Sequence, residues 1–111
     1  EMHGRVFAAV SHLPHLLSFA LVHELAKRED ADLFFTFAAS GYRDFTRIAA
    51  SHPERWRDIC LANRDALVAE LDGYMAGLAR LRIALEQCDG ASLEVVFENA
   101  RRARRAWTHD G

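Results

Sequence analysis

The sequence is poor in residues that interrupt helices. It contains only two prolines and six glycines among 111 residues, and the alternation of β-branched and polar residues that is typical of strands is nearly absent. Apolar residues recur with helical periodicity instead. We therefore expect an all-α fold, a helical bundle formed by a single domain over residues 1–111.

The sequence also lacks the motifs that identify common cofactor and catalytic sites. No GxGxxG segment follows a strand, and P-loop, GxSxG and HExxH motifs are absent. We therefore expect no Rossmann domain and no cofactor-binding residue in this chain. The two cysteines, Cys60 and Cys88, form no CxxC pair, which excludes a cysteine-rich zinc site and fits a reducing cytoplasm.

Charge of either sign is not in large excess. The formal net charge is −2, which predicts neither a polyanion-binding protein nor an acidic tail. One basic run stands near the end of the chain, and it consists of Arg101, Arg102, Arg104 and Arg105. Cations at the carboxyl end of a helix suit its dipole, and no aromatic residues interleave with them as in nucleic-acid sites. We expect no nucleic-acid partner.

One apolar run is long enough to raise the question of a membrane. The run from Val6 to Val22 covers about 17 residues, which is the lower limit for a transmembrane helix. It contains His12, Pro14 and His15, which are poor lipid-facing residues. We interpret it as a buried core helix and expect no membrane partner.

The first predicted helix, residues 3–27, is apolar on most of its sides, so we expect it to be central. Pro14 lies inside it and removes a backbone donor. A kink is expected there, with carbonyl groups near Val10 and Ser11 left free. Such a kink can build a polar pocket in a helical bundle, or it can simply be tolerated.

Three further helices are predicted around the middle and at the end of the chain. Two short ones cover about residues 31–39 and 42–50, and the Ser40-Gly41 pair breaks the chain between them, with Gly41 as a helix cap. The last helix runs from about 93 to 107, with Ser92 as its N-cap.

The longest helix is expected between Pro53 and Gln87. The segment from Ser51 to Glu54 reads as a capping box, with Ser51 as the N-cap and Pro53 in the first turn. About 35 helical residues would span about 52 Å, whereas a domain of this size is about 35 Å across.

An apolar seam runs along this predicted helix with spacings of four and three. The seam would be bare unless a partner covered it, and two-fold homodimers are the commonest oligomers. We therefore expect an intertwined homodimer. A break near Gly73, giving a helical hairpin, is the alternative. The seam residues are Leu67, Leu71, Tyr74, Leu78, Leu81 and Leu85.

Four polar residues share one face of the first predicted helix: Ser11, His12, His15 and Ser18. A single histidine at such a place is usually a satisfied core residue. Two histidines and two hydroxyls beside a proline favour a ligand-facing role. A metal site is disfavoured, because no third ligand accompanies the histidines at a fixed spacing.

A second polar cluster contains Arg43, Asp44 and Arg47. The two arginines are four residues apart on one helical face, and arginine suits bidentate capture of a carboxylate or phosphate. Asp44 could hold Arg43 in an ion pair. Trp56, one turn into the long helix, could wall an aromatic-sized ligand. The alternative is an ordinary solvated helix face.

Three segments together resemble the prephenate and arogenate dehydrogenases. They are VFAAVSHLPH at residues 6–15, GYRDFTRIA at residues 41–49, and Trp56-Arg57-Asp58-Ile59 followed by Asn63. They occur in the family's order and cover roughly residues 3 to 70. The family's pattern has His-Asp where this chain has His3-Gly4, and Gly-Gly where it has Ser40-Gly41.

The resemblance implies a helical dimerisation domain that follows an N-terminal domain for NAD or NADP. The family's reaction is an oxidative decarboxylation: hydride passes to the nicotinamide and the ring carboxylate leaves as CO2. By resemblance, Arg47 pairs with a carboxylate of prephenate or arogenate, and His12, His15 and Ser11 line the same site. Trp56, Ser40 and Gly41 close it. No catalytic residue is expected in this chain.

Two other functions remain open at this point. One is a stand-alone helical dimer that binds an anionic metabolite in a regulatory role. The other is a purely structural dimerisation domain. The same residues would serve the first, whereas the second predicts that substituting Arg47 changes no activity.

Overall fold

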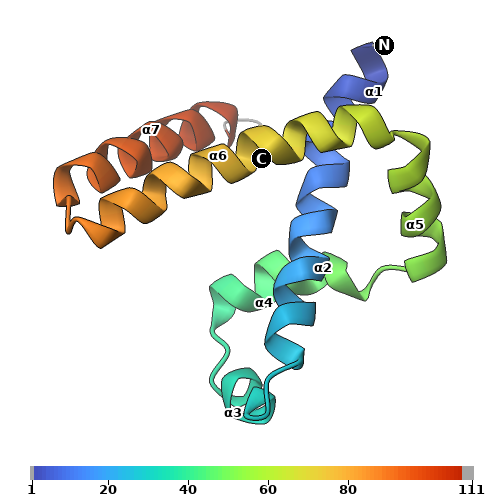
Figure 1. The fold of residues 1–111 in the computed structure, drawn as a ribbon, viewed down its shortest axis with the longest axis horizontal. Coiled ribbons are helices and arrows are strands. Elements are labelled where there is room, and N and C mark those ends of the chain that lie inside the picture. The colour runs from blue at the N-terminus through green and yellow to red at the C-terminus, as the bar shows by residue number, and fades with distance from the viewer. Residues whose placement is uncertain (1, 109–111) are drawn as a thin grey trace. The chain divides into compact units, whose positions relative to one another are not determined.

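The computed structural model describes residues 2–108, and every regular element in that range is a helix. The predicted all-α class is confirmed. The chain forms two compact units, residues 1–71 and 72–111, and the boundary falls inside one helix. Figure 1 shows the elements along the chain.

The first unit is built around one continuous helical segment. It comprises α1 (Met2–Phe7), a π-helical turn η1 (Ala8–His12) and α2 (Leu13–Ala26). Helix α2 packs against α3 (Ala31–Thr36), α4 (Ser40–Thr46) and the 3-10 turn η2 (Arg47–Ala50). The first helix is therefore the element around which the unit is organised, as the sequence predicts.

The disturbance expected at Pro14 takes the form of the π-helical turn. The Leu13 N–H bonds to the carbonyl oxygen of Ala8, five residues back, one more than in an α-helix. A proline ring clashes with the carbonyl group of the residue four before it, and a wider turn relieves that clash. The π turn ends directly before the element that holds Pro14.

The prediction of one helix from Pro53 to Gln87 is wrong. The structure has α5 (Pro53–Ala62) and α6 (Arg64–Glu86), separated at Asn63, whose φ of −123° and ψ of 36° are not helical. The chain turns sharply there (Figure 1). Helix α6 spans about 35 Å, so overhang of a single long helix no longer argues for a dimer. The alternative break near Gly73 is also wrong, because α6 runs through it.

Helix α5 begins where predicted but with a different cap. His52, not Ser51, is the N-cap, and its Nδ1 accepts a hydrogen bond from the Arg55 N–H at 3.4 Å. Pro53 occupies the first helical turn. The ring nitrogen of His52 thus accepts the capping hydrogen bond that the Ser51 hydroxyl was expected to accept.

The second unit is a helical hairpin of the end of α6 and α7 (Gly90–Thr108). Asp89, rather than Ser92, caps α7: its carboxylate accepts from the Ser92 N–H at 3.0 Å and from the Ser92 hydroxyl at 2.6 Å. Between the helices, Cys88 has a positive φ of 54°. The Asp89 N–H bonds to the Ala84 carbonyl and the Cys88 N–H to the Leu85 carbonyl, which is a Schellman motif.

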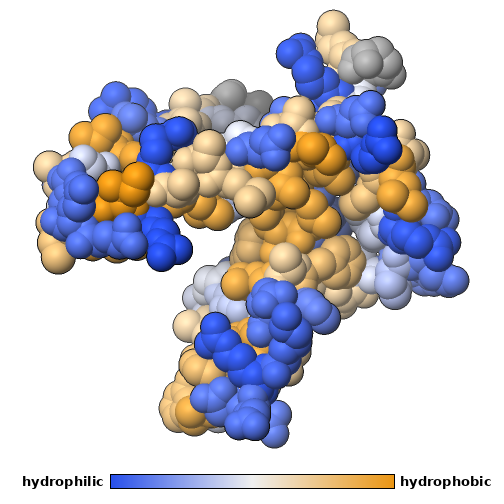
Figure 2. Space-filling view, viewed as in Figure 1, coloured by the Kyte–Doolittle hydropathy of each residue, from blue (hydrophilic) through white to orange (hydrophobic). Residues whose placement is uncertain are grey.

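Few apolar side chains are buried within the chain. Only Ala8, Leu13, Leu67 and Ala84 are buried hydrophobic residues among residues 2–108. Figure 2 shows apolar side chains, in orange, on the surface of both units. The first helix is thus central in its unit without being covered on all sides, since Val10 is 67% exposed.

The segment Met2–Ala26 is long and apolar enough to cross a membrane by length and composition, and 17% of its most apolar window is buried within the chain. Most of this segment is therefore exposed within residues 2–108, and the burial expected for a core helix is not reached within the described chain.

Candidate functional site

Two of the predicted histidines and the predicted tryptophan meet in the first unit. The His15 and Trp56 rings stack with centroids 3.6 Å apart and an interplanar angle of 13°. The His12 ring meets Trp56 edge-on, at 6.1 Å and 77°. These contacts join α5 to the π turn η1, through His12, and to α2, through His15. We call His12, His15 and Trp56 the aromatic cluster.

The π turn contributes to the cluster through its backbone. His15 Nδ1 lies 2.9 Å from the Ser11 carbonyl oxygen. A carbonyl group near Ser11 was expected to be free beside Pro14, and the His15 ring is its partner. Ser11 therefore serves the site through its main chain.

Asn63 is the residue that sequence reasoning missed. Its amide nitrogen donates to the Gly4 carbonyl oxygen at 2.7 Å and lies 3.3 Å from His12 Nδ1. Asn63 appeared only as the last residue of a motif, and no role was assigned to it. An asparagine inside a continuous helical pattern is a signal for a break, because its side chain competes for backbone hydrogen bonds.

The other member of the predicted polar face takes no part in the cluster. Ser18 is fully buried, and its hydroxyl has no hydrogen-bond partner within residues 2–108. The Tyr42 hydroxyl on α4 is likewise buried without a partner there.

The predicted arginine cluster is arranged differently from the expectation. Arg43 Nε donates to the Ala38 carbonyl oxygen at 3.2 Å, and no ion pair between Arg43 and Asp44 forms in the described chain. Arg47 is exposed at the start of η2, and its side chain has no hydrogen bond or ion pair to residues 2–108. Its element packs against α2, which carries His15.

The Ser40-Gly41 pair is not a break. Both residues lie in the first turn of α4, after an extended Ala39. Gly41 is therefore not a C-cap, and a β-carbon there would meet nothing within 4 Å. Within residues 2–108 no side-chain hydrogen bond involves Ser40, and the role of Ser40 and Gly41 in closing a substrate site stays a prediction.

A small groove lies beside Trp56, between α2 and α5. Its volume is about 350 Å³, within the range of small-molecule sites. Burial raises the pKa of the Cys60 thiol, so the thiolate that a nucleophile needs is disfavoured. The lining residues are Leu16, Phe19, Pro53, Trp56, Arg57, Cys60 and Leu61.

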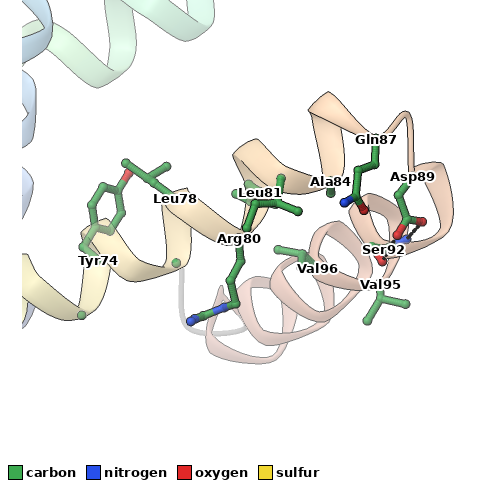
Figure 3. A pocket seen from close by; sticks show the side chains of 13 residues that line it. Tyr74, Leu78, Arg80, Leu81, Ala84, Gln87, Asp89, Ser92, Val95 and Val96 are labelled. Atoms are coloured by element: carbon green, nitrogen blue, oxygen red, sulfur yellow. Dashed lines mark hydrogen bonds between the residues drawn. The ribbon is translucent and has the colours of Figure 1, made fainter.

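A larger groove, of about 720 Å³, lies between α6 and α7 in the second unit. Figure 3 shows Leu78, Leu81 and Ala84 contributed by α6 and Val95 and Val96 by α7. The seam residues Tyr74 and Leu78 are 40% and 47% exposed. The groove is therefore an apolar surface that the chain itself leaves open.

The basic run on α7 is engaged within its own helix. Glu98 forms ion pairs with Arg101 and Arg102, at 2.8 and 3.6 Å. The Arg104 guanidinium lies 4.3 Å from the centre of the Trp107 ring. Such contacts along one helix are what an ordinary solvated helical face offers.

Comparison with known proteins identifies the family to which this helical fold belongs. The chain is 37% identical to the cyclohexadienyl dehydrogenase of Zymomonas mobilis subsp. mobilis, over 99% of this chain and 38% of that protein. It is 38% identical to the prephenate dehydrogenase of Bacillus subtilis, over 91% and 28%. The chain thus spans about a third of these relatives' length.

Two solved structures are similar to this chain over nearly its whole length. The prephenate dehydrogenase of A. aeolicus in complex with hydroxyphenyl propionate and NAD+ superposes with a TM-score of 0.86 and 35% identity, over 96% of this chain and 37% of that one. Synechocystis arogenate dehydrogenase gives 0.88 and 27%, over 96% and 39%.

These findings define the class: an all-helical domain that forms part of longer dehydrogenases. The family described as prephenate dehydrogenase, dimerization domain, matches residues 1–99. The chain belongs to this family, and the resemblance drawn from its three motifs is confirmed.

Proposed function

We propose that this chain is the C-terminal dimerisation and substrate-binding domain of a prephenate or arogenate dehydrogenase of tyrosine biosynthesis. The observation that carries the proposal is the aromatic cluster, in which two histidines and a tryptophan from distant helices meet, in a chain matched to the family over residues 1–99.

The substrate of such an enzyme is a ring that bears a hydroxyl and carboxylates. Arg47 supports the binding of one carboxylate, since the residue is exposed and its side chain has no hydrogen bond or ion pair within residues 2–108. A guanidinium fork matches a carboxylate with two parallel hydrogen bonds. Its element packs against the helix that holds His15, which favours one shared site.

The nicotinamide cofactor is proposed to bind outside this chain. Residues 2–108 contain no strand, so they cannot form the strand, glycine-rich turn and helix that hold a dinucleotide. The cofactor would accept the hydride, and the described residues would bind and orient the substrate. We assign no catalytic acid or base to this chain.

The second role, dimerisation, is supported by the surface that the chain exposes. Within the second unit, Tyr74 and Leu78 on α6 are 40% and 47% exposed, and Val95 and Val96 on α7 are 59% and 44% exposed. Apolar side chains of this kind form the core of obligate dimer interfaces. A second copy of the chain would cover the groove between α6 and α7.

The proposed location is the cytoplasm. Both cysteines are free thiols, Cys60 half-buried and Cys88 exposed, as a reducing compartment would keep them.

The test is an assay of the native full-length protein with prephenate and with arogenate, each with NAD and with NADP, followed by reduced-cofactor absorbance. Arg47→Ala should lower kcat/KM about 10- to 150-fold, because charge-assisted hydrogen bonds contribute about 1.5–3 kcal/mol. Arg105→Ala is the matched control, since Arg105 is also exposed.

Turnover by the wild type that collapses in Arg47→Ala and persists in Arg105→Ala would support both the reaction and the role of Arg47. Absence of turnover with every substrate and cofactor pair would refute the dehydrogenase. Equal activity of the two variants would remove Arg47 from the substrate site.

A further inference from the structure

Asn63 caps the end of helix α5, and its side chain contacts the first helical segment. It is the one residue between α5 and α6, and its amide reaches two groups of the first helical segment, the Gly4 carbonyl and the His12 ring. Because the helix breaks at Asn63, this side chain does not lie along the side of one continuous helix. What the amide does to His12 follows from donor and acceptor chemistry.

The Gly4 carbonyl oxygen can only accept a hydrogen bond, so the Asn63 amide nitrogen, and not its oxygen, must face it. The same NH2 group carries a second hydrogen, which points to His12 Nδ1 at 3.3 Å. His12 Nδ1 must then offer its lone pair. The neutral ring carries its hydrogen on Nε2, which is therefore a donor.

The same reasoning gives His15 the opposite state. The partner of its Nδ1 is the Ser11 carbonyl oxygen, at 2.9 Å. Because that oxygen can only accept, Nδ1 must carry the hydrogen. The neutral ring then leaves a lone pair on Nε2, which is an acceptor.

We propose that Asn63 is a positioning residue that sets His12 as a hydrogen-bond donor, while the backbone of the π turn sets His15 as an acceptor. The two rings at Trp56 then present opposite polarity through their Nε2 atoms, which have no described partner within residues 2–108. Such a pair selects a ligand that offers both an acceptor oxygen and a hydroxyl donor. This selectivity rests on the proposed function, since a cyclohexadienol carboxylate carries both groups.

The tautomers can be measured without any activity. The 111-residue chain, with ¹⁵N-labelled histidine, is examined by long-range ¹H–¹⁵N correlation NMR near neutral pH. His12→Gln and His15→Gln assign the two rings. We expect His12 to be protonated on Nε2 and unprotonated on Nδ1, and His15 to show the reverse. A wild-type His12 protonated on Nδ1 alone overturns the proposal.

Free histidine already favours the Nε2–H form, so the wild-type spectrum alone does not show that Asn63 sets the tautomer of His12. The Asn63→Asp variant tests this directly. A carboxylate only accepts, so His12 Nδ1 should become protonated while His15 is unchanged. Asp65→Asn, an exposed change two residues away, is the control and should leave both rings as they are. An Asn63→Asp spectrum identical to that of the wild type would show that Asn63 does not set His12.

In the full-length enzyme, Asn63→Asp should raise KM for the substrate by about tenfold or more, with the Asp65→Asn control near the wild type. An inverted His12 tautomer with unchanged KM would overturn the selectivity. Absence of turnover in the wild type would refute the proposed function, whereas the NMR result on Asn63 would still stand.

Discussion

Replacing Cys88 by glycine should stabilise the hairpin of the second unit. Cys88 occupies the left-handed position of the Schellman motif that ends α6, with φ at 54°. An L-residue there is crowded between its β-carbon and the following carbonyl oxygen, at a cost of about 1–2 kcal/mol. Glycine has no β-carbon and adopts this conformation freely.

The magnitude follows from two opposing terms. Removing the crowding gains about 1–2 kcal/mol, and the greater freedom of glycine in the unfolded chain returns about 0.5–1 kcal/mol. The midpoints of the two terms leave a net gain in the free energy of unfolding of roughly 0.7 kcal/mol. In a chain of this length that raises the Tm by about 2–5 °C.

The assay is thermal unfolding by far-ultraviolet circular dichroism, at one fixed protein concentration because a dimer's Tm depends on it. Cys88→Ser is the matched control. It removes the exposed thiol and keeps a β-carbon in the same conformation, so its Tm should stay near that of the wild type. A Cys88→Gly variant no more stable than Cys88→Ser would refute the conformational argument.

Two further outcomes are expected in the second unit. Hydrogen bonds from Ser92 lower the pKa of Asp89, so its contribution to stability is complete above the ordinary value of 3.8 and is lost as the pH falls through the lowered pKa. Asp89→Asn should remove this loss of stability at acid pH. A Tm difference between the variant and the wild type that stays constant with pH would contradict the role of Asp89 as the cap of α7. Leu78→Asp places a charge in the apolar groove between α6 and α7, and light scattering should show the proposed dimer giving way to monomer. A dimer of the variant that persists at micromolar concentration would place the interface elsewhere.

The aromatic cluster shows how far sequence patterns reach. Helical spacing alone predicted that His12 and His15 lie on one face, because that relation is local. Their meeting with Trp56 required α5 to fold back against α2, and this packing is tertiary. Asn63 was missed for the same reason: its partners, Gly4 and His12, lie far away along the chain.

The predictions that the structure overturns concern places where single residues interrupt or end a regular helical pattern. The periodicity from Pro53 to Gln87 continues across Asn63, so pattern alone predicted one helix. The caps shifted from Ser51 to His52 and from Ser92 to Asp89, since several polar side chains near a helix start compete for the same N–H groups. Arg43 bonds to the nearby Ala38 carbonyl, an acceptor that spacing from Asp44 did not suggest.

The sequence by itself determined the helical class, the family and the residues of the polar face, because helical periodicity and ordered motifs are properties of the chain. Only the tertiary structure decided where the long helix breaks, which ring nitrogens are bonded, and which apolar surfaces stay open. Those depend on contacts between segments far apart in the chain, and their energies are set by the neighbours that folding brings within reach.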